Sequence, residues 1–142
     1  MREKILTFIE KNSRINLKEL AIMLGVDEAS VANEIAAMEQ ENVICGYHTL
    51  IDWEKVSDEK VTALIEVRVT PMRGQGFDSI AERIYNYPEV RSVYLISGAY
   101  DLMVILEGKT LKQVSGFVSD KLSTLDSVLS TATHFILKKY KD

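Results

Sequence analysis

The spacing of apolar residues changes from a helical to a strand period near residue 60, and this change constrains the fold more than any other feature of the sequence. Up to residue 41, apolar residues recur every three or four positions, as on one face of an amphipathic helix. Residues 61–69 are rich in β-branched side chains, and Ile65, Val67 and Val69 alternate with charged residues. The change predicts two domains of different architecture, joined by a polar linker over residues 52–60 that contains the single tryptophan.

Residues 1–51 are predicted to form a winged helix-turn-helix domain. Three short helices are expected: one of roughly ten residues ending at the turn 11–13, one over residues 17–24 stopped by Gly25, and one that begins at Asp27 as N-cap and reaches about Glu41. Only residues 25–27 separate the last two helices, which is typical of helix-turn-helix geometry. The stretch 43–51 holds β-branched and aromatic residues, so a small hairpin or wing is expected there. A unit of about 50 residues buries only some 60% of the surface that its unfolded chain exposes, so we expect it to be stabilised by packing against a partner chain.

Residues 61–142 predict a β-α-β-β-α-β order. The expected elements are a strand at 61–69, a helix at 77–84, strands at 90–96 and 100–106 around a turn at 97–99, a helix at 111–125, and a strand at 128–138. This order is that of the ferredoxin-like fold, with four antiparallel strands and both helices on one face of the sheet. The fold class is therefore α+β, and the other face of the sheet is expected to be covered by a second subunit.

Composition and motifs argue against several classes of protein. No run approaches the roughly 18 apolar residues of a membrane-spanning helix, and the N-terminus reads as an amphipathic helix, so we expect a soluble cytoplasmic protein. One cysteine, Cys45, and two histidines, His48 and His134, are too few for a zinc site within one chain. The sequence has no phosphate-binding loop, nucleophile elbow or dinucleotide fingerprint, and Gly74-Gln75-Gly76 is interpreted as a simple turn. We therefore predict no catalytic residues, no metal and no cofactor.

The pair Tyr100 and Asp101 beside Gly98 is the most informative polar motif. A carboxylate next to a glycine turn can accept hydrogen bonds from an ammonium group, and the N–H groups of the turn can hold a carboxylate. The alternative, left open by the sequence, is a hairpin turn capped by the aspartate.

The whole arrangement resembles the Lrp/AsnC (feast/famine) family of transcriptional regulators. The matching segments are Ile5-Leu6, Asn12-Ser13-Arg14-Ile15, Glu19-Leu20-Ala21 to Gly25-Val26, Met38-Glu39 to Val43-Ile44-Cys45-Gly46-Tyr47, Pro88-Glu89-Val90 and Ser97-Gly98-Ala99-Tyr100-Asp101-Leu102. The resemblance implies a homodimer paired through the C-terminal sheets, often assembled further into rings such as an octamer. It also implies a small effector, commonly an amino acid, bound at subunit contacts near the Gly-x-Tyr-Asp turn. By this resemblance the effector-site residues are Ser97, Gly98, Tyr100, Asp101, Thr131 and Thr133.

The predicted recognition helix departs from the family pattern in its charge. Residues 1–52 carry five basic and nine acidic side chains, a balance of −4, whereas residues 53–142 carry twelve of each. No Lys or Arg lies between Asp27 and Asn42, where family members usually carry arginines. The remaining candidates for contact with double-stranded DNA are Ser30 and Asn33, which could bond to base edges, and Arg14 and Lys18, which could bind phosphates. The alternative to phosphate contact is that Arg14 and Lys18 simply lie on solvated faces of their helices.

These observations predict a DNA-binding regulator of the Lrp/AsnC type in which a metabolite bound between subunits favours one assembly geometry. The alternative is an effector-binding assembly protein of the same fold with weak or lost DNA binding. A related haem-precursor decarboxylase is a third interpretation, but it needs His or Arg around a tetrapyrrole and no such group of residues is visible.

Overall fold

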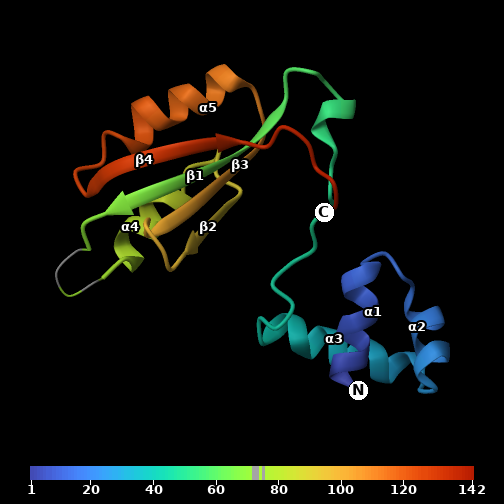
Figure 1. The fold of residues 1–142 in the computed structure, drawn as a ribbon. Helices are drawn as coiled ribbons and strands as arrows, with labels where there is room; N and C mark the ends of the chain where they lie inside the picture. Colours follow the sequence, from blue (N-terminus) through green and yellow to red (C-terminus); the bar gives the residue numbers. More distant parts are fainter. Residues whose placement is uncertain (72–73, 75) are drawn as a thin grey trace. The chain divides into compact units, whose positions relative to one another are not determined.

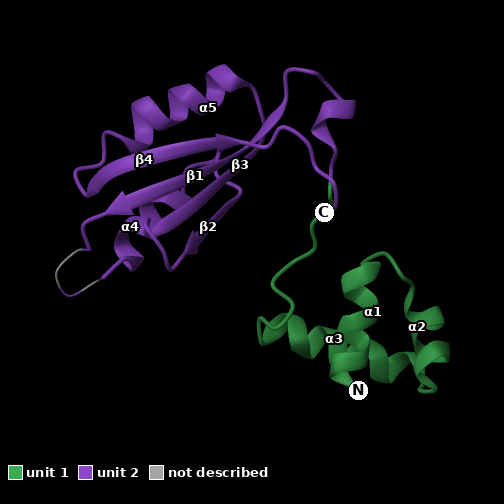
Figure 2. Cartoon of the chain, viewed as in Figure 1, with its two compact units in different colours: residues 1–50 green, residues 51–142 purple. Residues whose placement is uncertain are grey.

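The computed structural model describes residues 1–71, 74 and 76–142, and it divides into two compact units, unit 1 at residues 1–50 and unit 2 at residues 51–142 (Figure 2). Of the predicted turn at 74–76, Gln75 lies outside the described residues. Gly74 and Gly76 have φ angles of 81° and 58°, a backbone region that favours glycine.

Unit 1 contains the three predicted helices: α1 (Arg2–Lys11), α2 (Leu17–Leu24) and α3 (Glu28–Gln40) (Figure 1). The Asn16 side chain accepts a hydrogen bond from the Glu19 N–H at 2.7 Å and caps α2. Gly25 ends α2 with a φ of 68°, so the chain turns sharply toward α3. The apolar faces of the three helices meet in a small core that consists of Ile5, Leu20, Ala21, Val31 and Met38.

The hairpin predicted over 43–51 is wrong for this chain. Residues 45–52 adopt no regular secondary structure, and the N–H groups of Val43 and Ile44 both bond to the Met38 carbonyl at the end of α3. β-branched residues favour a pleated surface, but a strand also needs a neighbouring strand to receive its backbone hydrogen bonds. Unit 1 offers no such neighbour within the described residues, so composition alone predicted a strand that does not form.

Unit 2 is an antiparallel sheet with the strand order β2-β3-β1-β4, crossed by two helices (Figure 1). Its elements are β1 (Val61–Val69), α4 (Asp78–Tyr85), β2 (Ser92–Leu95), β3 (Leu102–Lys109), α5 (Leu111–Phe117) and β4 (Val128–Phe135). The order and pairing confirm the predicted ferredoxin-like βαββαβ arrangement and the α+β fold class.

The two faces of this sheet differ in their surroundings. Ile65 and Val67 of β1 and Val104 of β3 pack with α4 and α5 into one buried core, so both helices cover one face as predicted. The alternate residues of the central strands point to the other face, which carries a mixture of apolar and charged groups: Leu64, Glu66, Arg68, Met103, Ile105 and Glu107. No element of unit 2 within the described residues packs over this open face, which we define by those residues.

Several element ends differ from the prediction. The strand expected at 100–106 begins at Leu102, since Tyr100 and Asp101 belong to the preceding turn. The helix expected at 111–125 passes at Val118–Leu122 into a π-helical turn, and the last strand ends at Phe135. The predicted linker contains a short 3-10 helix, η1 (Trp53–Lys55).

Candidate nucleic-acid and effector sites

The helix-turn-helix presents fewer free polar groups than its sequence suggests. Arg14, Lys18 and Asn33 are exposed, and no ion pair of theirs occurs within the described residues. The Ser30 hydroxyl, however, donates a hydrogen bond to the Asp27 carboxylate at the start of α3, which lowers the pKa of Asp27. Ser30 must therefore leave Asp27 before it can donate to a base.

Arg2 was not predicted as a functional residue, and in the structure it pairs with carboxylates of α3 and its C-cap. Its guanidinium binds Glu34 through Nε at 2.7 Å and Glu41 through Nη2 at 2.8 Å, and these bonds, with Glu41 the stronger influence, raise the pKa of Arg2. The nearest signal in the sequence was the absence of cations on α3, which leaves its carboxylates in need of a partner from elsewhere. The pairing offsets one of the two negative charges of Glu34 in α3 and Glu41 at its C-cap, and it occupies the arginine.

A turn at residues 97–101 closes one end of the sheet in unit 2. The Asp101 N–H donates to the Val67 carbonyl at 3.0 Å, and the Asp101 carboxylate accepts from the Val69 N–H at 2.9 Å. The aspartate thus clamps the turn to β1, so one carboxylate oxygen has a structural role. This geometry shows the turn-capping role that the sequence left open, while the second oxygen forms no hydrogen bond within the described residues.

Arg68, also missed by the sequence analysis, fixes the same turn from the open face. Its Nη2 and Nε donate to the Ala99 carbonyl at 2.7 and 3.2 Å, and its guanidinium lies 5.1 Å from the centre of the Tyr100 ring. No carboxylate pairs with Arg68 within the described residues. The sequence signal was a lone arginine on the face of β1 that points away from the helices.

The predicted effector residues fall into two groups. Gly98 has a φ of 148°, and a Cβ added there would meet nothing within 4 Å, so its backbone is open to solvent beside the exposed Ser97. In contrast, Thr131 and Thr133 lie opposite Val67 and Ile65 in the β1–β4 ladder and so share the helix-covered side of the sheet. Arg68 and the turn therefore lie together, whereas the two threonines lie across the sheet from the Arg68 face.

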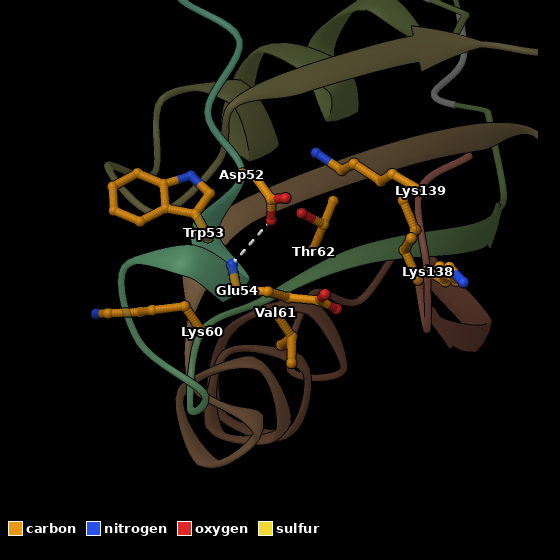
Figure 3. Close-up of a pocket in the computed structure, with 9 residues that line it drawn as sticks. Asp52, Trp53, Glu54, Lys60, Val61, Thr62, Lys138 and Lys139 are labelled. Atoms are coloured by element: carbon orange, nitrogen blue, oxygen red, sulfur yellow. Dashed lines mark hydrogen bonds between the residues drawn. The ribbon is translucent and has the colours of Figure 1, made fainter. Parts of the chain in front are cut away.

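A pocket of about 160 Å³ lies where η1 meets the beginning of β1 and the segment after β4 (Figure 3). Trp53 forms one wall, and its ring rests on Gly108: a Cβ at Gly108 would lie 2.8 Å from the indole Cε2. This segment was predicted to be a linker only, although the single tryptophan of the chain was a signal of packing.

Other classes of site find little support in the described part of the chain. It contains no helix long and apolar enough to cross a membrane, and no group of three or more His, Cys, Asp or Glu side chains placed to hold a metal ion. His134 lies on the open face with its Nε2 at 3.5 Å from the Glu66 carboxylate, and His48 is exposed after α3.

Comparison with known proteins agrees with this architecture. Residues 1–44 match the family model of a winged helix-turn-helix DNA-binding domain, and residues 62–142 match the Lrp/AsnC ligand binding domain. The uncharacterized HTH-type transcriptional regulator YugG of Bacillus subtilis is 55% identical over 139 residues, which cover 97% of this chain and 84% of that protein.

Solved structures share the fold over almost the whole chain. The transcriptional regulator NMB0573 of Neisseria meningitidis, in complex with L-Met, superposes with a TM-score of 0.79 at 23% identity, covering 99% of this chain and 90% of that one. A feast or famine regulatory protein of M. tuberculosis complexed with L-methionine gives 0.78 at 20% identity, covering 99% and 92%. Together with the matched family models and the relative of 55% identity, these likenesses show that the chain belongs to the Lrp/AsnC family of helix-turn-helix transcriptional regulators.

Proposed function

We propose that this regulator senses a small amino acid at the turn 97–101 and changes its hold on double-stranded DNA in response. The observation that carries the proposal is the clamped turn itself: Arg68 and Asp101 fix it to β1 while the Gly98 backbone stays open. An amino acid carries a carboxylate and an ammonium group, and this turn offers a guanidinium, open backbone N–H groups and a carboxylate oxygen. The L-methionine complexes of the two structural relatives support this class of effector.

The proposed assembly is a homodimer joined through the open face of the sheet, with an octamer as a further step. Leu64, Met103 and Ile105 lie on that face, and Tyr94 of β2 is 54% exposed there. An antiparallel sheet with one uncovered face that carries apolar groups is stabilised when a second layer packs on it. In this proposal the effector binds where a second chain approaches the turn, so that ligand and assembly are thermodynamically linked.

The DNA contact is proposed to use Arg14 and Lys18 on phosphates and Asn33, with Ser30 after release from Asp27, on base edges. These cations compensate only part of the acidic surface around α3, so we expect modest affinity with a shallow salt dependence. The pairing of Arg2 with Glu34 and Glu41 favours the second candidate function, an effector-binding assembly protein with weak or lost DNA binding.

One experiment separates the two candidates. Fluorescence anisotropy of the full chain is measured with DNA from its own promoter region and with a scrambled duplex of equal length, at low and at physiological salt. Promoter-selective binding that weakens with salt and changes on addition of L-methionine supports the regulator as proposed. Absence of binding at low salt, with amino-acid binding retained in calorimetry, would establish the second candidate instead.

A further inference from the structure

The pocket beside Trp53 is separate from the turn 97–101. Its walls include Val61 and Thr62 at the first end of β1, whereas Arg68 lies near the last end of the same strand. Six residues of a strand span roughly 20 Å. A ligand in this pocket therefore cannot also touch the turn of the same chain.

Thr62 presents a hydrogen-bonding group to the pocket. Its side chain belongs to the only buried polar residue in the described part of the chain, with 8% of its surface exposed, and it lines the pocket. Its hydroxyl has no hydrogen-bond partner among the described residues, and Figure 3 shows it turned toward the Asp52 carboxylate. The hydroxyl is not one of the buried polar atoms that lack a partner, so it reaches the space of the pocket and can bond there to water or to a ligand.

Groups of both charges surround that hydroxyl. The Asp52 carboxylate accepts only the Glu54 N–H, at 3.2 Å, and the Glu54 carboxylate has no ion pair within the described residues. Lys139 enters from the segment after β4, where its ammonium is shared between Glu107 and Asp142, each at 3.3 Å. In Figure 3, Lys60 and Lys138 extend away from the middle of the pocket, so Asp52, Glu54 and Lys139 are the charges nearest to a ligand.

We propose that this pocket is a second ligand site that binds a small zwitterion, a free amino acid with a short side chain. Asp52 and Glu54 face its ammonium group, and the Thr62 hydroxyl bonds to the polar end of the ligand. Lys139 binds its carboxylate by turning away from Glu107 and Asp142. The Trp53 ring supplies an apolar wall that Gly108 holds in place. A pocket of 160 Å³ has room for about five waters, which is close to the volume of such a ligand.

The position of the site gives it a regulatory use. Asp52, Trp53 and Glu54 begin two residues after residue 50, the last residue of the DNA-binding unit. A ligand that bonds to this segment stabilises η1 and restricts the backbone that carries the helix-turn-helix. The site acts on the linker, whereas the proposed effector turn acts on the contacts between chains.

Trp53 is the only tryptophan of the chain, so its fluorescence reports on the pocket directly. The full chain is titrated with the standard L-amino acids, one at a time, up to about 10 mM, a range that detects millimolar affinities. We expect a saturable change in Trp53 emission for amino acids with short side chains. The N-acetyl and amide derivatives of the best ligand should each bind at least about fivefold more weakly, because each loses one charge.

Variants locate the response. Thr62→Val keeps the shape of the side chain and should weaken binding about five- to tenfold, whereas Thr7→Val, which removes an exposed hydroxyl of α1, should have no effect. If Thr62→Val lowers the melting temperature, Glu54→Gln on the exposed η1 provides the same test without a change in the core. Arg68→Ala, which disables the turn, should leave the Trp53 response intact.

Three results would overturn the proposal: no saturable emission change with any amino acid, equal affinity of the wild type with both Thr62→Val and Glu54→Gln, or loss of the Trp53 response in Arg68→Ala. The last result would mean that the signal is transmitted from the turn. The proposed function is tested separately, since amino-acid binding in calorimetry that Arg68→Ala abolishes would support the turn even if the pocket stays empty.

Discussion

The two units of the molecule use their key arginine in opposite ways. In unit 1, Arg2 is bound by the carboxylates of Glu34 and Glu41, so its charge is compensated within the unit. In unit 2, Arg68 is held by the Ala99 carbonyl and the Tyr100 ring, and no carboxylate within the described residues neutralises it. A positioned cation without a carboxylate partner can bind an anionic ligand directly, whereas one paired with carboxylates must first exchange that partner for the ligand.

The units also differ in the size of their cores. Five buried apolar residues form the core of unit 1, whereas the described part of unit 2 contributes thirteen to its core. A small core has little stability to lose, so the DNA-binding unit should be the more sensitive of the two to truncation.

The largest expected effect follows from this difference in cores. Met38→Ala in unit 1 and Ile65→Ala in unit 2 both truncate side chains with 0% exposure, and each should cost about 2–5 kcal/mol of the free energy of unfolding. We expect Met38→Ala to unfold unit 1 while unit 2 stays folded, and Ile65→Ala to leave both folded at 25 °C. Amide hydrogen exchange resolved along the chain measures each unit. Met23→Ala, at a residue 54% exposed, is the matched control and should stay within about 0.5 kcal/mol. Retention of exchange protection in unit 1 of Met38→Ala would contradict the comparison.

The next effect concerns the arginine of unit 2. Arg68→Ala removes a charge-assisted bond to the turn and should weaken amino-acid binding there by about 10- to 100-fold in calorimetry. Arg68→Lys should recover only part of this loss, since an ammonium group cannot bridge a carbonyl and a ligand in one planar fork. The exposed Arg83→Ala on α4 controls for net charge. Unchanged affinity in Arg68→Ala would show that the turn binds without its cation.

A smaller effect is expected from the arginine of unit 1. The double substitution Glu34→Gln and Glu41→Gln frees Arg2 and removes two negative charges, so DNA affinity at low salt should rise about tenfold with a steeper salt dependence. Glu3→Gln with Glu10→Gln makes the same change of net charge on α1 without releasing Arg2. Anisotropy titrations at several salt concentrations compare the two. Equal gains would mean that net charge alone, and not the pairing of Arg2, limits DNA binding.

The smallest expected effect is the response to acid. Lys121, hydrogen-bonded to Glu89 at 2.5 Å, lowers the pKa of Glu89 in unit 2, as the Ser30 hydroxyl lowers that of Asp27 in unit 1. A lowered carboxyl pKa contributes stability that is present above the unfolded value near 4 and is lost as the pH falls through the folded value. Melting temperatures measured from about pH 6 to pH 2 should therefore fall less steeply in Lys121→Gln and in Ser30→Ala than in the wild type. Parallel curves for all three proteins would exclude these two pairs as sources of acid sensitivity.

Much of the fold could be predicted because its signals are local. The glycine at 25 and the apolar spacing of 17–24 determine α2 to the residue, and the alternation over 61–69 determines β1. The wing was predicted wrongly because a strand depends on a neighbour that residues 43–51 do not have within the described chain. The start of β3 was misplaced by two residues, because Tyr100 and Asp101 belong to the turn, where the Asp101 carboxylate accepts from the Val69 N–H.

The sequence by itself therefore determined the two-domain order, the helix-turn-helix and the glycine turn with its aspartate, since each depends on residues within a few positions of one another. Only the tertiary structure decided how the charges are used. Arg2 binds Glu34 across 32 residues, and Arg68 binds Ala99 across 31. The Trp53 ring of η1 packs on Gly108 of β3, which is also distant in the sequence. Such pairs leave no periodic signal in a single chain, because it is the packing of β1 against β3, and of α1 against α3, that brings their atoms together.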